Sequence, residues 1–377
     1  MKTIYVLILL SLCSLVYAEA TINVPNSDTS IGFAGKIHLD VLVNSDDMGN
    51  KTGFSPATIP VNNNSGNVQT TLSAGQTKFQ FMTATPMEGD TLNTLIEWDW
   101  YNRDNSSDFH LTQLWAQYKS FGAGQTFSVF MDISTFPNTL EYFGPNSMVF
   151  VRQPQIRYTL PLSNEQRFAF AIEQPNSVIE GVDNCVNASA CEAYSAIPDF
   201  TAHWRMESGK SHIQIAGILR QVGYQFDQDD TESAVGYGVN ISGNLQLTDS
   251  DLLSAALVYG EGIGRYINDT SLSDTDAVVK ANGDVEALPV FGMYAFLDHA
   301  WNDATHSSIG YGFLELDNGK DQANDAFKQS NFFVINIIHN MAKSVQIGTE
   351  LQWGDLEVND GSDGDNLRWQ SSVIYRF

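Results

Sequence analysis

The sequence predicts an all-β protein, a transmembrane up-and-down antiparallel β-barrel of about sixteen strands. Three features carry this prediction: a strictly alternating closing segment, an export signal at the other end of the chain, and alternating segments of strand length in between. Beyond the first twenty residues there is no run of about 18 consecutive apolar residues, so no membrane-spanning helix is expected. A closed barrel is the only other structure that satisfies its backbone hydrogen bonds in hydrocarbon.

The closing segment, residues 367–377, alternates strictly between two kinds of side chain. One face carries Leu367, Trp369, Ser371, Val373, Tyr375 and Phe377, and the other carries Arg368, Gln370, Ser372, Ile374 and Arg376. A mostly apolar face opposite a face with two arginines fits a wall between lipid and water. We expect this strand to close the barrel against residues 31–43, with Tyr375 and Phe377 as the closing and insertion signal.

The amino-terminal segment has the pattern of a cleaved secretory signal. A short positive region precedes an almost entirely apolar stretch, and small residues predict cleavage after Ala18 or Ala20. We interpret residues 1–20 as the signal peptide, 21–30 as a short periplasmic segment and 31–377 as the barrel domain. The exported chain is predicted to be integral to a bacterial outer membrane.

Alternating segments follow one another along the rest of the chain. In residues 31–43, apolar residues at alternate positions oppose Lys36, His38 and Asp40. Such segments lie at 31–43, 77–83, 92–100, 112–118, 168–172, 200–206, 213–219, 235–241, 253–259, 288–297, 308–314, 333–337, 345–353 and 367–377. Two more strands around residues 124–159 give about sixteen, an even number as bacterial barrels require. A barrel of this size leaves an aqueous channel.

The connections alternate in length, as expected if both chain ends face the periplasm. Short turns are expected at 121–124, 162–165, 208–211 and 341–344, and long extracellular loops at 44–70, 175–197 and 261–284.

The net charge is −25, and the acidic residues are concentrated in 46–47, 227–232, 317–325 and 355–365. We interpret these acids as solvated loops, with divalent-cation bridging to lipopolysaccharide as a second interpretation. The charge excludes nucleic-acid binding.

One loop, residues 132–148, is too apolar to lie freely in water. It lies between the expected fifth and sixth strands, and we predict that it folds into the lumen and narrows the pore. The residues expected at this constriction are Phe136, Pro137, Asn138, Glu141, Tyr142 and Phe143. The alternative is that the loop packs over a neighbouring subunit or over the barrel rim.

Four motifs also carry a family resemblance. They are GQTFSVFMDISTFPN at 124–138, FGPN at 143–146, VFVRQPQIRY at 149–158 and GEGIGRY at 260–266. Together they resemble the DcaP-like porins of Gram-negative bacteria, and the similarity covers about residues 31–377. The resemblance implies a trimeric, sixteen-stranded porin for small, preferentially anionic solutes such as dicarboxylates. Founding members of that family carry heptads before the barrel, and residues 21–30 show none, so no periplasmic coiled coil is expected here.

Cations that face the lumen would select the solute. Alternation places Arg157, Arg205, His203 and Arg220 on the inner face, and Lys36 and Asp132 complete the predicted pore-lining set. Arg152 has the parity of the apolar face and would turn inward only at the strand's outer end or after a bulge at Pro154. Guanidinium groups suit this role because they stay charged and grip carboxylates bidentately. The alternative for each arginine is a structural ion pair with a loop carboxylate such as Asp132 or Glu141.

Two cysteines of the exported chain, Cys185 and Cys191, lie in one expected extracellular loop. They are predicted to form a disulfide, because the exported chain meets an oxidising periplasm. The seven histidines are scattered, and no Gly-x-Ser-x-Gly element or phosphate loop is found. We therefore expect no catalytic residues, no cofactor and no metal.

The predicted function is a diffusion channel for small hydrophilic solutes that prefers anions such as dicarboxylates. The expected partners are small anionic solutes, outer-membrane lipid and lipopolysaccharide, and further copies of the chain in a homotrimer. A cation-preferring general porin is one alternative. A barrel that serves mainly as a surface receptor or adhesin is another, and an outer-membrane hydrolase is the third.

Overall fold

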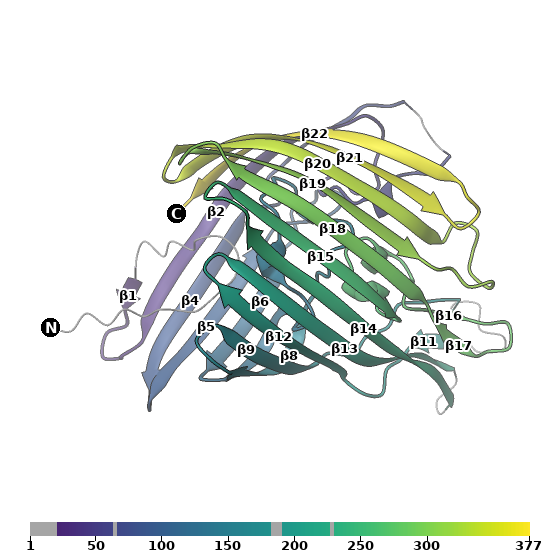
Figure 1. Ribbon diagram of the computed structural model, residues 1–377, viewed down its shortest axis with the longest axis horizontal. Helices are drawn as coiled ribbons and strands as arrows, with labels where there is room; N and C mark the ends of the chain where they lie inside the picture. The colour runs from purple at the N-terminus through teal and green to yellow at the C-terminus, as the bar shows by residue number, and fades with distance from the viewer. Residues whose placement is uncertain (1–20, 63–65, 182–190, 227–229) are drawn as a thin grey trace.

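The strands form a closed antiparallel barrel, shown in Figure 1. The computed structural model describes residues 21–62, 66–181, 191–226 and 230–377. The barrel strands are β2 (Ser30–Asn44), β3 (Gln69–Ser73) with β4 (Lys78–Met87), β5 (Asp90–Asp99), β6 (His110–Tyr118), β7 (Phe121–Phe127), β8 (Arg152–Pro161), β9 (Gln166–Glu173), β12 (Asp199–Ser208), β13 (Ser211–Phe226), β14 (Asp230–Gln246), β15 (Asp251–Glu261), β18 (Pro289–Ala300), β19 (Thr305–Leu316), β20 (Phe327–Ala342), β21 (Val345–Val358) and β22 (Asp363–Arg376). Both β3 and β4 pair with β2, one after the other, so they count as one strand of a sixteen-stranded barrel. The predicted fold is confirmed.

Short strands and helical turns lie next to the barrel strands or in the loops that connect them. The strand β1 (Thr21–Asn23) pairs with the start of β2, and β11 (Cys191–Ala193) pairs with the end of β13. A separate small sheet contains β10 (Ile179–Glu180), β16 (Ala277–Val279) and β17 (Val285–Ala287), and single helical turns are η1 (Pro56–Thr58), η2 (Ile133–Thr135), η4 (Gly264–Tyr266) and η5 (Thr270–Leu272). Among the described residues, no helix is long and apolar enough to cross a membrane.

The last strand closes the barrel against the first one, as predicted. Pairing between β2 and β22 runs from Asn44 opposite Arg368 to Lys36 opposite Arg376. Beyond that ladder, the Gly35 backbone N–H donates to the Phe377 carbonyl at 2.9 Å and the Phe377 N–H donates back at 3.1 Å. A Cβ atom at Gly35 would lie 2.7 Å from the Lys78 carbonyl oxygen and 2.9 Å from the Phe377 ring, so only glycine allows this close approach.

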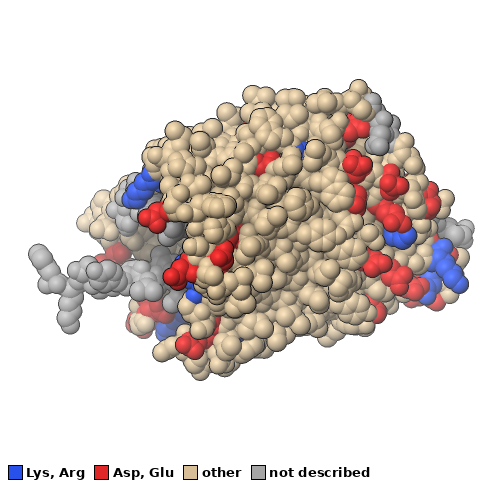
Figure 2. Space-filling view, turned by 45° about the horizontal axis from the view of Figure 1, so that its top comes forward, with Lys and Arg blue, Asp and Glu red and all other residues tan. Residues whose placement is uncertain are grey.

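The two faces of the wall differ as the alternation predicts. In β22, Trp369 and Tyr375 are exposed on the outer face, whereas Arg368 and Gln370 are buried on the inner face. Figure 2 shows a broad belt of the outer surface almost free of charged residues, with Asp, Glu, Lys and Arg gathered towards its two ends. An apolar belt between charged ends matches the hydrocarbon core and its two interfaces.

Connections alternate between short turns and long loops, and β1 and the carboxy-terminus lie at the end of the barrel that carries the short turns (Figure 1). One expected turn is wrong, because residues 121–124 belong to β7 and the chain reverses earlier, at Lys119 with a φ of 53°. Position 122 requires glycine because of packing against a neighbouring strand and not because of a turn. A Cβ atom there would lie 2.0 Å from the indole of Trp115 on β6.

Three loops fold into the lumen and pack on the inner wall. They are residues 45–62 between β2 and β3, residues 128–151 between β7 and β8, and residues 262–288 between β15 and β18. Their shared apolar cluster includes Met48, Phe54, Ile59, Phe130, Met131, Ile133, Met148, Val149, Ile263, Tyr266 and Ile267, against wall residues such as Phe296, Phe332 and Val334. Only the second of these insertions was predicted, and the other two narrow the lumen further.

Two predictions fall partly or wholly outside the described residues. The signal peptide, residues 1–20, lies outside them, and so does Cys185. Cys191 at the start of β11 is disulfide-bonded. The predicted pairing of these two cysteines and the cleavage after Ala18 or Ala20 therefore stay predictions.

Candidate pore constriction

Asp132 fixes the constriction loop to the inner wall. Its carboxylate accepts hydrogen bonds from Arg205 at 2.8 Å, His212 at 2.7 Å and Ser242 at 2.9 Å, and it caps η2 through the Ser134 backbone N–H at 3.1 Å. Burial alone would raise the pKa of Asp132, but the His212 hydrogen bond and the Arg205 charge outweigh burial and lower that pKa to about 2. The residue is thus an anchor for the loop, and its oxygens are already occupied.

Two buried glutamates fasten the middle of the loop. Glu350 on β21 accepts from the backbone N–H groups of Leu140 at 2.8 Å and Glu141 at 3.1 Å. Glu141 in turn accepts from the N–H of Phe54 at 2.9 Å and of Gly144 at 2.6 Å, which ties the loop at 128–151 to the one at 45–62. Burial outweighs these hydrogen bonds and raises the pKa of Glu141 to about 7.

Asp269 ties the first and third inserted loops together. It accepts from the Ser55 hydroxyl at 2.7 Å, the Ala57 backbone N–H at 3.1 Å and the Ser330 hydroxyl on β20 at 2.9 Å. Burial raises the pKa of Asp269 to about 7, because these hydrogen bonds only partly offset the cost of removing the charge from water. A carboxyl group therefore joins the first loop to each of the other two, whereas the Asn268 side chain joins the third loop to the second by donating to the Phe143 and Pro145 carbonyls at 2.8 Å each.

These two carboxyl groups make stability depend on pH. Their folded-state pKa values of about 7 lie above the ordinary values of 4.5 for a glutamate and 3.8 for an aspartate, so the stability they contribute is full at acidic pH and is lost as the pH rises through 7. We expect the free energy of unfolding to be lower at about pH 8 than at about pH 5, by about 1–2 kcal/mol per group. Urea unfolding should therefore begin at a lower urea concentration at the higher pH. Glu141→Gln with Asp269→Asn should flatten this dependence, and an unchanged pH profile in that variant would contradict the assignment.

Two of the predicted aromatic residues of the loop, Tyr142 and Phe143, pack on Tyr101. The ring of Tyr142 stacks on Tyr101 with centroids 3.8 Å apart, and its hydroxyl donates to Asp99 on β5 at 2.8 Å. Phe143 packs edge-on against Tyr101 at 5.5 Å. The constriction loop therefore reaches the wall near β5 as well as the wall near β21.

Phe136, Pro137 and Asn138 lie earlier in the same loop. The Phe136 ring packs against Phe150 at 6.0 Å, and the Asn138 carbonyl accepts hydrogen bonds from Ser308 at 3.0 Å and Asn336 at 2.8 Å. Ser308 and Asn336 belong to β19 and β20. These contacts place the loop inside the barrel rather than over its rim.

Arg152 turns inward at the outer end of β8. Its guanidinium lies over the rings of Phe127 and Phe150, at 5.7 and 5.3 Å, and it interacts with the Tyr142 hydroxyl of the constriction loop. Glu97 and Asp99 on β5 lie within its electrostatic reach. The constriction thus combines one arginine on β8 with two carboxylates on β5, with β6 and β7 between them in the wall.

Two of the predicted pore arginines serve ion pairs instead of the passage. Arg220, only 1% exposed, lies 3.0 Å from Asp276 in a loop and 3.3 Å from Asp199 on β12. Arg205, 5% exposed, pairs with Asp132 at 2.8 Å and with Glu207 at 2.7 Å. The alternative interpretation, a structural ion pair, therefore applies to both residues, because each guanidinium is buried and held by two carboxylates.

Arg157 and Lys36, like Arg152, form no ion pair with a carboxylate of the described residues. The Arg157 guanidinium donates to Gln155 at 3.0 Å and to the Phe127 carbonyl, and it lies 5.3 Å from the Trp115 ring. No carboxylate oxygen in the described part of the chain lies within 4.0 Å of either side chain. Both are half-buried on the inner face, so their charges meet the water of the lumen.

His203, also in the predicted set, faces the constriction loop. One ring nitrogen lies 2.9 Å from the Val129 carbonyl oxygen, so this nitrogen carries the proton and donates. His203 therefore supports the loop where it leaves the wall.

Sequence analysis did not single out Lys78, Arg167 or Arg376 as pore residues. Lys78 on β4 pairs with Glu97 at 3.1 Å, and Arg167 on β9 pairs with Glu207 at 2.9 Å. Arg376 donates to Gln346 at 3.0 Å. Strand parity would have identified these residues as inward-facing, but only the register of neighbouring strands shows which cations lie side by side.

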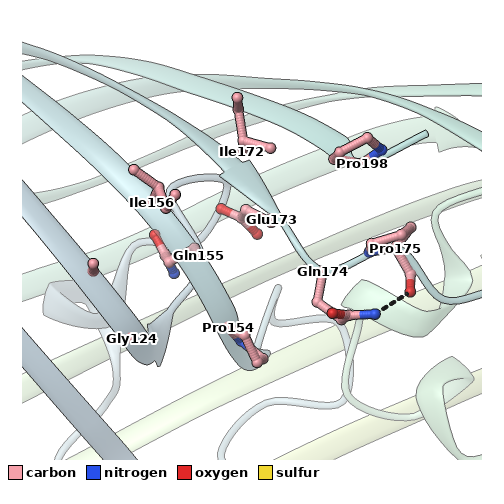
Figure 3. A pocket seen from close by; sticks show the side chains of 10 residues that line it. Gly124, Pro154, Gln155, Ile156, Ile172, Glu173, Gln174, Pro175 and Pro198 are labelled. Carbon is pink, nitrogen blue, oxygen red and sulfur yellow. Dashed lines mark hydrogen bonds between the residues drawn. The ribbon is translucent and has the colours of Figure 1, made fainter.

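A shallow hollow of about 330 Å³ lies in the wall at β7, β8 and β9 (Figure 3). Its lining includes Ile156 and Ile172, which are exposed on the outer face of the barrel, together with Pro154, Pro175 and Pro198. The hollow therefore opens towards lipid. It lies outside the passage through the lumen.

A sixteen-stranded barrel with a loop folded inward between its fifth and sixth strands is the architecture of an outer-membrane porin. The chain belongs to the DcaP outer membrane protein family, whose model matches residues 12–377. The protein is thus an outer-membrane channel. No curated protein matches the chain.

Solved structures share the fold at low sequence identity. The outer membrane channel DcaP of Acinetobacter baumannii has a TM-score of 0.81 and 18% identity, with 95% of this chain and 100% of that chain covered. The anion-selective porin from Comamonas acidovorans has a TM-score of 0.61 and 9% identity, with 93% and 100% covered. A trimer form of OmpT from Vibrio cholerae has a TM-score of 0.58 and 11% identity, again with 93% and 100% covered.

Proposed function

We propose that the channel passes small hydrophilic solutes and prefers anions such as dicarboxylates. The supporting observation is Arg157, a cation on the inner wall just below the constriction whose charge no carboxylate within 4.0 Å neutralises in the described residues. The carboxylate whose charge acts on Arg157, Glu173, already accepts four hydrogen bonds from other groups. The structure described as an anion-selective porin shares the fold.

The net charge of −25 does not oppose this preference. Acidic residues crowd into the outer loops, where screening over about 8 Å at physiological salt limits their reach. Charges inside a narrow passage between protein walls interact more strongly with a solute. Several acids inside the barrel are paired with cations, as Glu97 is with Lys78 and Asp132 is with Arg205. The unpaired cations of the inner wall therefore act against acids that are either paired or screened.

We infer that the protein is a homotrimer that contacts lipid and, through its acidic loops, lipopolysaccharide. The trimer form of a porin with the same fold supports the first part of this inference. Cleavage of residues 1–20, the Cys185–Cys191 disulfide and an insertion signal at Tyr375 and Phe377 belong to the same proposal. The packing of the Phe377 ring on Phe33 and Phe79, at 5.9 and 5.8 Å, supports the role of the carboxy-terminus.

Arg157→Gln tests the anion preference. Succinate should block the ion current of wild-type channels in planar bilayers, and in the variant the blocking concentration should rise about tenfold, because a hydrogen bond to a charged group contributes about 1.5–3 kcal/mol. The matched control is Lys210→Gln, which removes an exposed cation from the turn after β12 and should leave block unchanged. Equal block of wild type and Arg157→Gln would contradict the proposal.

A further inference from the structure

Three cations lie side by side on the inner wall where the barrel closes. Lys36 on β2 is directly opposite Arg376 on β22 in one direction and directly opposite Lys78 on β4 in the other. Directly opposed residues of antiparallel strands point to the same face, and for Lys36 that face is the lumen. The three charges therefore form one row across three adjacent strands. Lys36 is within electrostatic reach of both neighbours.

The row is only partly neutralised by the protein. Lys78 pairs with Glu97 at 3.1 Å. In the described residues, no carboxylate oxygen, that of the chain terminus included, lies within 4.0 Å of the Lys36 or Arg376 nitrogens. Like charges directly opposite each other destabilise a sheet, so this arrangement costs the barrel free energy, which the Lys78–Glu97 pair offsets only in part.

Neutral groups hold the two unpaired cations in place. The Lys36 ammonium donates to one ring nitrogen of His38 at 3.1 Å, and the other ring nitrogen lies 2.9 Å from Asp40. Asp40 therefore fixes the tautomer that leaves an acceptor for Lys36. On the other side, Arg376 donates to Gln346 at 3.0 Å, and Gln346 donates to Asn340 at 3.0 Å. Each cation keeps further donors free towards the lumen.

We propose that Lys36, Lys78 and Arg376 form a binding site for dianionic carboxylates at the mouth that carries β1 and the carboxy-terminus. Figure 1 shows β2 and the carboxy-terminus at that end of the barrel. Three cationic side chains in a row can bind both carboxylates of a dianion at once, whereas a monoanion engages only part of the row. The site therefore favours dianions over monoanions. The inference rests on the proposed anion preference and adds a second anion-binding site, separate from Arg157 on β8.

Side-specific block tests the site. Succinate is added to one side at a time of planar bilayers that hold oriented channels, and acetate serves as the monoanionic comparison. In wild type, succinate on the side of the carboxy-terminus should block at lower concentration than succinate on the loop side. In Lys36→Gln with Arg376→Gln this sidedness should disappear, with a loss of about tenfold or more.

Controls separate charge from folding. Lys210→Gln at the same mouth should keep the sidedness, and Lys36→Arg should restore it where Lys36→Gln loses it. If the double variant fails to fold, as heat-modifiable migration would show, the Lys36→Gln and Lys36→Arg pair carries the test. Unchanged sidedness in the glutamine variants, or equal block by acetate and succinate, overturns the site. A wild-type channel that succinate blocks from neither side overturns the proposed function as well.

Discussion

Arg220→Met should destabilise the folded barrel by about 3–5 kcal/mol, because it leaves the buried Asp276 without its cation and the buried Asp199 with only Arg265 at 3.5 Å. Arg220 lies between Asp199 on β12 and Asp276 in the inserted loop at 262–288, and it also donates to the Gly262 carbonyl at 2.8 Å. Methionine fills a similar volume but offers no charge and no donor. Urea titration of the refolded protein in detergent, followed by heat-modifiable migration, measures the loss.

Arg167→Met provides the matched control for this substitution. Its ion pair with Glu207 is partly exposed, with side chains 24% and 32% accessible, and such pairs contribute at most about 1 kcal/mol. The unfolding midpoint should therefore shift far more for Arg220→Met than for Arg167→Met. Similar shifts would show that the Arg220 network is not the anchor described above.

Asp132→Asn should release the start of the constriction loop and raise the single-channel conductance. The substitution keeps the size of the side chain but removes the charge that pairs with Arg205 and His212, which leaves the buried Arg205 with only the partly exposed Glu207. Breaking a buried pair in this way costs about 3–5 kcal/mol, enough to populate conformations in which the loop leaves the wall. Larger and noisier open currents are the expected record.

Asp303→Asn in the turn after β18 is the control for this prediction, because Asp303 is exposed at the barrel end opposite the long loops. Its conductance should equal that of wild type. An Asp132→Asn channel with wild-type conductance and noise would mean that other contacts, such as those of Glu141 and Glu350, hold the loop alone.

Local periodicity was sufficient to predict the wall. Alternation in residues 367–377 correctly assigned Trp369 to the outer face and Arg368 to the inner face. The predicted pairing of this last strand with the first barrel strand, β2, is also confirmed. The apolar content of residues 132–148 correctly predicted an inserted loop. In each case the signal lies in consecutive residues, which is where the side-chain direction of a strand is decided.

The contents of the lumen could not be predicted in the same way. Met48, Phe54 and Ile59 carry no periodic signal, and the loop that holds them packs against residues hundreds of positions away, such as Phe332. The parity of a strand assigns Arg220 and Arg157 to the same inner face. It does not show that Asp276 contacts Arg220, or that no carboxylate of the described residues contacts Arg157. Those partners come from non-local packing.

The reversal potential of single wild-type channels in a potassium chloride gradient tests the central claim most directly. A channel whose passage is dominated by Arg157 and the row formed by Lys36, Lys78 and Arg376 should reverse at a potential of the sign set by chloride, and succinate on either side should reduce the current. A reversal potential of the sign set by potassium, with no effect of succinate, would contradict the account and assign control of entry to the acidic loops.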